Sequence, residues 1–153
     1  MLKIVVLITI VLLLFTVVYG LHYHTGPEMY PALKDGDLVL YSRLATSYRA
    51  GDLVVMATQG HTQVLRAIAL PSDKVDVTEE GLIINDALVQ EPDIYQDTLR
   101  YTTDIDFPLI VGSDEVFVLG DARQDATDSR VFGPVKTDDI QGVAITALRR
   151  RAL

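Results

Sequence analysis

The sequence contains no cysteine, so neither a disulfide nor a thiol nucleophile contributes to its fold or chemistry. It is also poor in basic charge, with 13 lysine and arginine residues against 21 aspartate and glutamate residues. A phosphate-binding face needs a basic excess, so the formal net charge of −8 excludes nucleic acid as a partner. Internal repeats and low-complexity stretches are absent as well. What remains is an acidic chain of 153 residues, a length that suits a single domain.

Charge is missing altogether from one stretch near the N-terminus. Residues 4–21 are uncharged, Lys3 precedes them, and the next basic residue is Lys34. A helix of about eighteen residues is roughly 27 Å long, the lower limit for crossing a bilayer. We therefore predict a single transmembrane anchor over residues 1–22, in contact with membrane lipid, and one domain over residues 23–153. The positive-inside rule places the N-terminus in the cytoplasm and that domain outside the cell. A signal peptide cleaved near Val18-Tyr19-Gly20 is the alternative.

Beyond the anchor, the pattern is typical of short β-strands. Hydrophobic runs that alternate or are rich in β-branched residues are separated by turn signals such as Gly51-Asp52 and Asn85-Asp86. The predicted strands cover residues 37–43, 53–56, 62–70, 74–78, 82–84, 115–119 and 140–148. This spacing predicts an all-β barrel or sandwich of short antiparallel strands behind the N-terminal helix. Residues 92–108 are acidic and lack a period, which indicates a long loop.

Neither the histidines nor the paired acids predict a metal or cofactor site. His22 and His24 are close in sequence, but His61 is distant, and no carboxylates stand at ligand spacing beside them. Acids near glycines, such as Asp35 and Asp37, are typical turn formers rather than a hydrolytic pair. We expect no metal and no cofactor.

The segment that follows the anchor, residues 26–37, is where an enzyme acting on membrane-emerging peptides would place its nucleophile. Pro27 and Pro31 fix their own backbone and bias the residue before each towards an extended conformation. We predict that this segment is held open rather than coiled. It presents Glu28, Met29 and Tyr30.

Three stretches, in this order behind an N-terminal anchor, resemble the boxes of the type I signal peptidase family. Residues 28–33 (Glu-Met-Tyr-Pro-Ala-Leu) are similar to its Ser-Met-x-Pro-Thr-Leu box. Residues 65–73 (Leu-Arg-Ala-Ile-Ala-Leu-Pro-Ser-Asp) are similar to its Lys-Arg-Val-Ile-Gly-x-Pro-Gly-Asp box. Residues 120–135 are similar to its Gly-Asp-Asn-Arg…Asp-Ser-Arg-x-Phe-Gly-x-Val box. The resemblance covers nearly the whole chain and implies a β-rich extracytoplasmic fold with a substrate groove lying against the membrane.

The family's chemistry rests on a Ser–Lys dyad, in which a desolvated lysine deprotonates the serine. The resemblance places Glu28 at the nucleophile and Leu65 at the general base, with Gly26 and Ala126 at two supporting serines. None of these residues supplies the required chemistry, so no catalytic residue is predicted. The retained groove positions are Met29, Tyr30, Pro31 and Arg66. The retained structural box consists of Gly120, Asp121, Arg123, Asp128, Ser129 and Arg130.

The chain also resembles signal-peptidase-like proteins of Gram-positive pilus loci that lack the dyad. The resemblance implies a catalytically inactive, membrane-anchored homologue that binds extended polypeptides and assists pilus assembly on the cell surface. Its implied partners are secreted or pilin polypeptides, with a sortase or an active signal peptidase beside it. Two alternatives stay open. One is an active peptidase that uses noncanonical residues, such as Thr25 with Lys34 or Lys74. The other is a regulator of an active signal peptidase.

Overall fold

The computed structural model describes residues 1–45, 47–58 and 60–149 of the chain. Its helices are α1 (Leu2–Val18) and α2 (Ser129–Phe132), with a 3₁₀ turn, η1 (Thr137–Asp139). Its strands are β1 (Tyr19–Tyr23), β2 (Leu38–Ser42), β3 (Leu53–Thr58), β4 (His61–Ala69), β5 (Lys74–Thr78), β6 (Gly81–Ile84), β7 (Ala87–Leu88), β8 (Leu109–Ile110), β9 (Glu115–Leu119), β10 (Val135–Lys136) and β11 (Ile140–Leu148).

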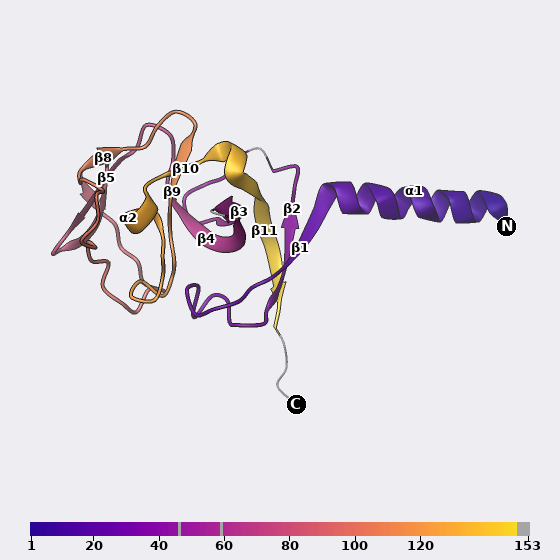
Figure 1. Ribbon diagram of the computed structural model, residues 1–153, viewed down its shortest axis with the longest axis horizontal. Helices are drawn as coiled ribbons and strands as arrows, with labels where there is room; N and C mark the ends of the chain where they lie inside the picture. The colour runs from indigo at the N-terminus through magenta and orange to yellow at the C-terminus, as the bar shows by residue number, and fades with distance from the viewer. Residues whose placement is uncertain (46, 59, 150–153) are drawn as a thin grey trace.

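The strands form two antiparallel sheets. The larger sheet has the order β1-β2-β11-β3-β4-β9-β10, and the smaller one has the order β7-β6-β5-β8. The smaller sheet lies at the end of the body opposite α1 (Figure 1). The prediction of a fold of short antiparallel strands is therefore confirmed. The pattern did not predict β1, β7, β8, β10 or α2, which have at most five residues each.

Two hydrophobic clusters form the core, and β9 contributes to both. Val116 and Val118 pack in the first cluster, with Met29, Val54 and Leu65 among its members. The alternate residues Phe117 and Leu119 pack in the second cluster, under the smaller sheet. Successive side chains of a strand point to opposite faces, so the apolar run of β9 fills both clusters. The second cluster otherwise consists of Ala69, Val75, Val77, Leu82 and Val111.

The N-terminal helix ends at Val18, four residues before the end of the predicted anchor segment. Residues 19–23 leave the helix because they pair with β2 in a register that joins Tyr19 to Ser42 and Tyr23 to Leu38. Gly20 permits this pairing, since a Cβ there would lie 2.2 Å from Cζ of Tyr41. Helix α1 extends away from the body, and none of its side chains is buried (Figure 1). Among the described residues, no helix combines the length and the apolar character needed to cross a membrane.

Residues 92–108 contain no regular element, in agreement with the predicted loop. The loop is nevertheless tied to the segment that begins at Gly120. The hydroxyl of Tyr101 donates to the backbone oxygen of Arg123 at 2.7 Å, and that of Thr103 donates to the backbone oxygen of Arg130 at 2.9 Å. The guanidinium of Arg130 lies 4.5 Å from the centroid of the Tyr101 ring. The loop thus braces residues 120–130 from outside.

Candidate functional site

Residues 26–33 coil into consecutive turns, so the prediction of an open, extended segment was wrong. The N–H of Tyr30 donates to the backbone oxygen of Pro27 at 2.9 Å, and that of Leu33 donates to the oxygen of Met29 at 2.8 Å. Gly26 enters these turns with a φ of +100°, a conformation that glycine adopts without strain. Local hydrogen bonds thus override the extended bias of the prolines.

The main chain of Glu28 is fixed by the segment that begins at Gly120. The N–H of Ala122 donates to the backbone oxygen of Glu28 at 2.9 Å. A Cβ on Gly120 would lie 2.7 Å from that same oxygen and 2.3 Å from Cβ of Ala126. Glycine is therefore required where the two segments meet. Three of the positions that the resemblance singled out, Glu28, Gly120 and Ala126, lie together here.

The side chain of Glu28 folds back over Gly26. A Cβ on Gly26 would lie 2.2 Å from Oε2 of Glu28. A serine at position 26 would therefore require the Glu28 carboxylate to move. Gly26 thus leaves room for the Glu28 carboxylate in its present position.

Leu65 lies on β4, opposite Val54 of β3, and is completely buried. It belongs to the first hydrophobic cluster together with Met29, the residue after Glu28. An aliphatic side chain in this environment packs and takes up no proton. Ala126, 4% exposed, packs against Gly120 and likewise has no polar atom to offer.

The predicted structural box is a buried network of charge-assisted hydrogen bonds. Asp121 accepts two bonds from Arg66, at 2.7 Å from Nε and 2.5 Å from Nη2. Asp128 accepts from Arg130 at 2.9 and 2.7 Å and from the N–H of Gly120 at 3.1 Å. Such pairs fix geometry more than they add net stability. The network therefore holds the segment that clamps Glu28.

Two further members of this network attach it to other parts of the fold. Ser129 accepts the N–H of Val118 on β9 at 2.9 Å. Arg123 is fully buried and donates two bonds of 2.6 Å to the carboxylate of Glu91. Sequence reasoning missed Glu91. Its one signal was that a buried arginine needs a carboxylate, and the acidic stretch around residue 92 contains several.

A cavity of about 250 Å³ opens beside Glu28. It contains all three histidines of the chain. The residues that line it are His22, His24, Thr25, Glu28, His61, Thr62, Gln63 and Val64. The first four come from β1 and the turns after it, and the last four come from the start of β4. We call this the histidine–glutamate pocket.

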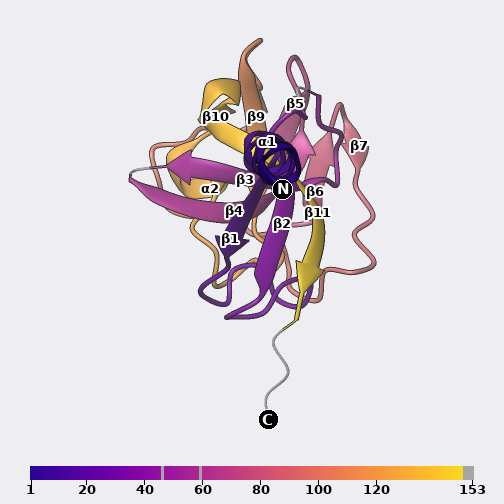
Figure 2. The same cartoon turned by 90° about the vertical axis from the view of Figure 1, so that its right-hand side faces the viewer.

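The histidine–glutamate pocket lies between two strand edges. Strand β1 is the end strand of the larger sheet and pairs with β2 alone. Residues 61–65 of β4 pair with β3, and the pairing of β4 with β9 begins only at Arg66. Within the described part of the chain, both segments thus keep one edge free of strand partners. Figure 2 shows strands β3 and β4 pointing away from the body.

His24 is the most unusual member of the histidine–glutamate pocket. Its side chain is 3% exposed, and its Nε2 has no hydrogen-bond partner. Burial lowers the pKa of His24 below its usual 6.5, although the carboxylates of Glu28, Asp37 and Asp35 act in the opposite direction. The imidazole is therefore neutral at neutral pH.

The predicted groove residues lie apart from this pocket. Met29 is completely buried in the core. Tyr30 is 55% exposed and lines a different cavity, where Nζ of Lys34 lies 5.8 Å from its ring centroid. Pro31 is half-buried. Arg66 is bound to Asp121 and lines a third cavity.

The model of the signal peptidase, peptidase S26 family matches residues 1–148. The chain belongs to this family. It is 33% identical over 150 residues to signal peptidase I U of Bacillus subtilis, covering 89% of this chain and 80% of that protein. It is 35% identical over 133 residues to a signal peptidase I of Bacillus caldolyticus, covering 76% and 72% of the two chains. The crystal structure of a signal peptidase I from Enterococcus faecalis superposes with a TM-score of 0.54 at 26% identity, covering 63% of this chain and 96% of that one.

Within this signal peptidase fold, the structure does not bring together a substitute dyad from the residues named in the sequence. Thr25 lines the histidine–glutamate pocket, but Lys34 lies over Tyr30 outside it. Lys74 belongs to β5 of the smaller sheet and pairs with Asp86 at 2.6 Å. Among the described residues, no group of three or more histidines, aspartates or glutamates is placed to hold a metal ion.

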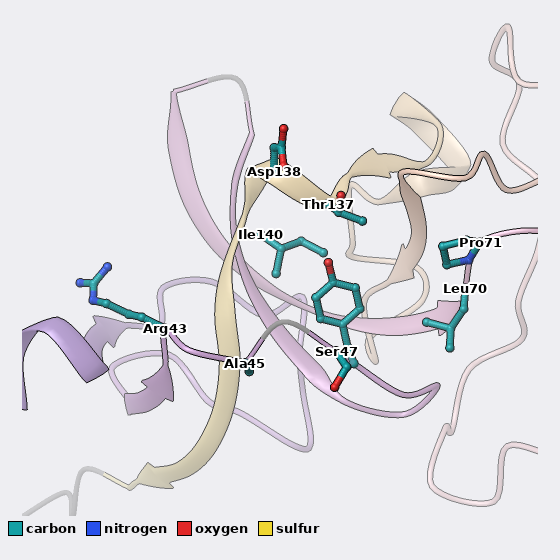
Figure 3. A pocket seen from close by; sticks show the side chains of 9 residues that line it. Arg43, Ala45, Ser47, Leu70, Pro71, Thr137, Asp138 and Ile140 are labelled. Carbon is teal, nitrogen blue, oxygen red and sulfur yellow. The ribbon is translucent and has the colours of Figure 1, made fainter.

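A larger cavity, of about 580 Å³, lies at the end of the second family box, residues 65–73. Leu70 and Pro71 border it on one side, and Thr137, Asp138 and Ile140 border it on the other (Figure 3). Arg43 extends away from this group. None of the positions that replace the dyad lines this cavity, so we place the candidate site at the histidine–glutamate pocket.

Proposed function

We propose that this member of the signal peptidase family holds extended polypeptides without cutting them. The observation that carries the proposal is a cleft bordered by free strand edges that lacks the side chains of a Ser–Lys dyad. Two free strand edges border one cavity, while Glu28 and Leu65 stand where the resemblance places a serine and a lysine. The members of such a dyad act as a unit, so losing both removes nearly all of the catalytic effect.

Binding would use the backbone edges of β1 and β4. An extended polypeptide laid beside a free strand edge gains main-chain hydrogen bonds, and pockets between the strands accept alternate side chains. The turns around Glu28 are clamped by the segment 120–130, so the cleft is formed in advance of binding. A site formed in advance loses little conformational entropy on association.

We further propose that the protein acts at the cell membrane and assists the assembly of pilin subunits. The support for membrane attachment is helix α1, which is apolar after Lys3 in its first turn and has no buried side chain. The support for pilin assembly is the resemblance to dyad-lacking proteins of pilus loci. Fractionation of cells and deletion of the gene test the two parts separately. The protein should sediment with membranes, and cells without it should fail to polymerise pilins normally.

The direct test of holding without cutting uses the purified full-length protein and fluorescein-labelled extended peptides from secreted or pilin polypeptides. Saturable binding by fluorescence anisotropy, with no fragment in mass spectra, is expected. The matched variant is Val64→Pro, which introduces a proline ring at the free edge of β4. It should weaken binding, whereas Glu80→Gln in a turn of the smaller sheet should leave binding unchanged.

An active peptidase is the second candidate. It is favoured by the similarity to proteins named signal peptidase I and by the presence of Thr25 in the pocket. It requires cleavage of a preprotein by the purified protein and loss of that cleavage in Thr25→Ala or Lys34→Ala. A regulator of an active signal peptidase is the third candidate. It requires that the two proteins co-purify from the same membrane.

A further inference from the structure

We propose that the histidine–glutamate pocket receives the ammonium group of a lysine side chain in the bound polypeptide. This inference rests on the proposed function, because it names the side chain that selects one register of an extended chain in the cleft. It is carried by the charge around Glu28, by the buried unpartnered nitrogen of His24, and by the polar lining of the pocket.

The charge around Glu28 is negative and uncompensated. Among the described residues, no lysine or arginine forms an ion pair with Glu28. Arg66 instead donates two bonds to Asp121 and one, of 2.7 Å, to the backbone oxygen of Gly51. Lys34 lies over Tyr30. A cationic group that enters the pocket would therefore meet a carboxylate that is free to accept it.

Two more carboxylates, in the turn that follows His24, add to the negative electrostatic potential around Glu28. Asp35 accepts the N–H of Gly26 at 2.9 Å, and Asp37 accepts that of Lys34 at 2.9 Å. Among the described residues, the one ion pair to either of them comes from the exposed Arg149, whose Nε lies 3.9 Å from Asp37. The chain as a whole has a net charge of −8, which also favours the approach of a cation.

His24 provides the second observation, independent of the acids. A buried polar nitrogen without a partner is costly, and in native proteins such an atom usually meets a ligand or water. The neutral imidazole presents one unprotonated nitrogen, which accepts hydrogen bonds and cannot donate them. With the proton on Nδ1, Nε2 offers that lone pair. An ammonium has three donors and no acceptor, so it is the complement of both an imidazole lone pair and a carboxylate.

The rest of the lining agrees with this assignment. Seven of the eight lining residues are polar or ionisable, and Val64 is the one aliphatic member. The hydroxyls and amide of Thr25, Thr62 and Gln63 can accept further bonds, while a purely aliphatic side chain would leave these groups unpaired. His22 and His61 complete the wall from β1 and β4.

The experiment compares peptides that differ at one position. Fluorescein-labelled extended peptides carry lysine, norleucine, alanine or glutamate at a single site, which is moved along the peptide, and anisotropy gives Kd with the full-length protein. At one position, lysine should bind about 10-fold more tightly than norleucine, the expected value for one charge-assisted contact. Glutamate at that position should bind more weakly than norleucine.

The protein variants assign the effect to the pocket. Glu28→Gln should remove most of the preference for lysine over norleucine. Glu80→Gln, which removes the same charge from an exposed turn of the smaller sheet, should leave that preference unchanged. Circular dichroism and the urea midpoint of each variant establish that it is folded.

The possible outcomes distinguish the lysine assignment from the proposed function of holding extended polypeptides. If peptides bind but lysine and norleucine are equivalent at every position, the lysine assignment is overturned and the holding function stands. The same holds if Glu28→Gln keeps the full lysine preference. If no peptide binds at any position, the holding function itself fails.

Discussion

Replacing Leu65 by lysine tests whether this position can hold the base that the resemblance to the family places there. Leu65 is 0% exposed and packs in the first hydrophobic cluster. A lysine buried in such surroundings has its pKa lowered by about 3 to 5 units. An unfolded lysine titrates about 3.4 units above pH 7, so at 1.36 kcal/mol per unit its protonation in the unfolded state would lower the free energy of unfolding by about 4 to 5 kcal/mol at neutral pH. Leu65→Met, a volume-conserving control, should cost less than about 1.5 kcal/mol.

The sign of the pH dependence identifies the cause. The lysine of the variant binds its proton less tightly in the folded state than in the unfolded state, so the unfolded state carries more protons at neutral pH. Stability should therefore rise with pH, by about 1.4 kcal/mol per unit between the folded and unfolded pKa values. Urea unfolding of Leu65→Lys and Leu65→Met at several pH values measures the difference. A constant difference between them would refute the reasoning, because it would mean that the amine reaches solvent.

The same substitution has a functional arm. The double variant Glu28→Ser, Leu65→Lys restores both dyad residues but leaves Gly26 and Ala126 without their hydroxyls. We expect little or no cleavage of a preprotein by this variant in an electrophoretic assay. Efficient cleavage would contradict the claim that the surrounding positions have lost their function together with the dyad.

Three smaller predictions follow from single contacts, each measured by urea unfolding. Asp121→Asn should lower the free energy of unfolding by about 2 kcal/mol, because it removes a charged acceptor from Arg66. Gly26→Ala should cost about 2 kcal/mol in the natural chain but about 1 kcal/mol beside Glu28→Ala, since one part of the strain is positive φ and the other is the Glu28 carboxylate. His24 has a folded pKa below its unfolded value, so stability should fall as the pH drops below 6.5, and His24→Gln should flatten that loss. Additivity in the second case, or an unchanged acid profile in the third, would contradict these contacts.

The sequence predicted most of the larger strands because their signal is local. The alternation of β5 and the apolar runs of β3 and β9 appear within a few neighbouring residues. Strand β1 was hidden, because its uncharged residues continue the helical run and it forms only through pairing with β2. The coiling of residues 26–33 was missed for a related reason, since Gly26 and the hydrogen bonds between Tyr30 and Pro27 outweigh proline's bias.

The sequence predicted which residues of the candidate site match the family boxes, but it did not predict which side chains line the pocket. The box residues were found from the resemblance, but only the Asp128–Arg130 pair joins two of them, since Asp121 pairs with Arg66 and Arg123 pairs with Glu91. The histidine–glutamate pocket was not found, because His61 stands 37 residues after His24 in the sequence. Only the sheet order, which leaves the edges of β1 and β4 free beside one cavity, brings those side chains together.

The most direct test of the account is to incubate the purified full-length protein with labelled extended polypeptides and follow binding and cleavage in the same sample. The account predicts saturable binding that Val64→Pro weakens, with every polypeptide recovered intact. A fragment with a new N-terminus, produced by the natural chain and absent from Thr25→Ala, would contradict it and establish an active peptidase instead.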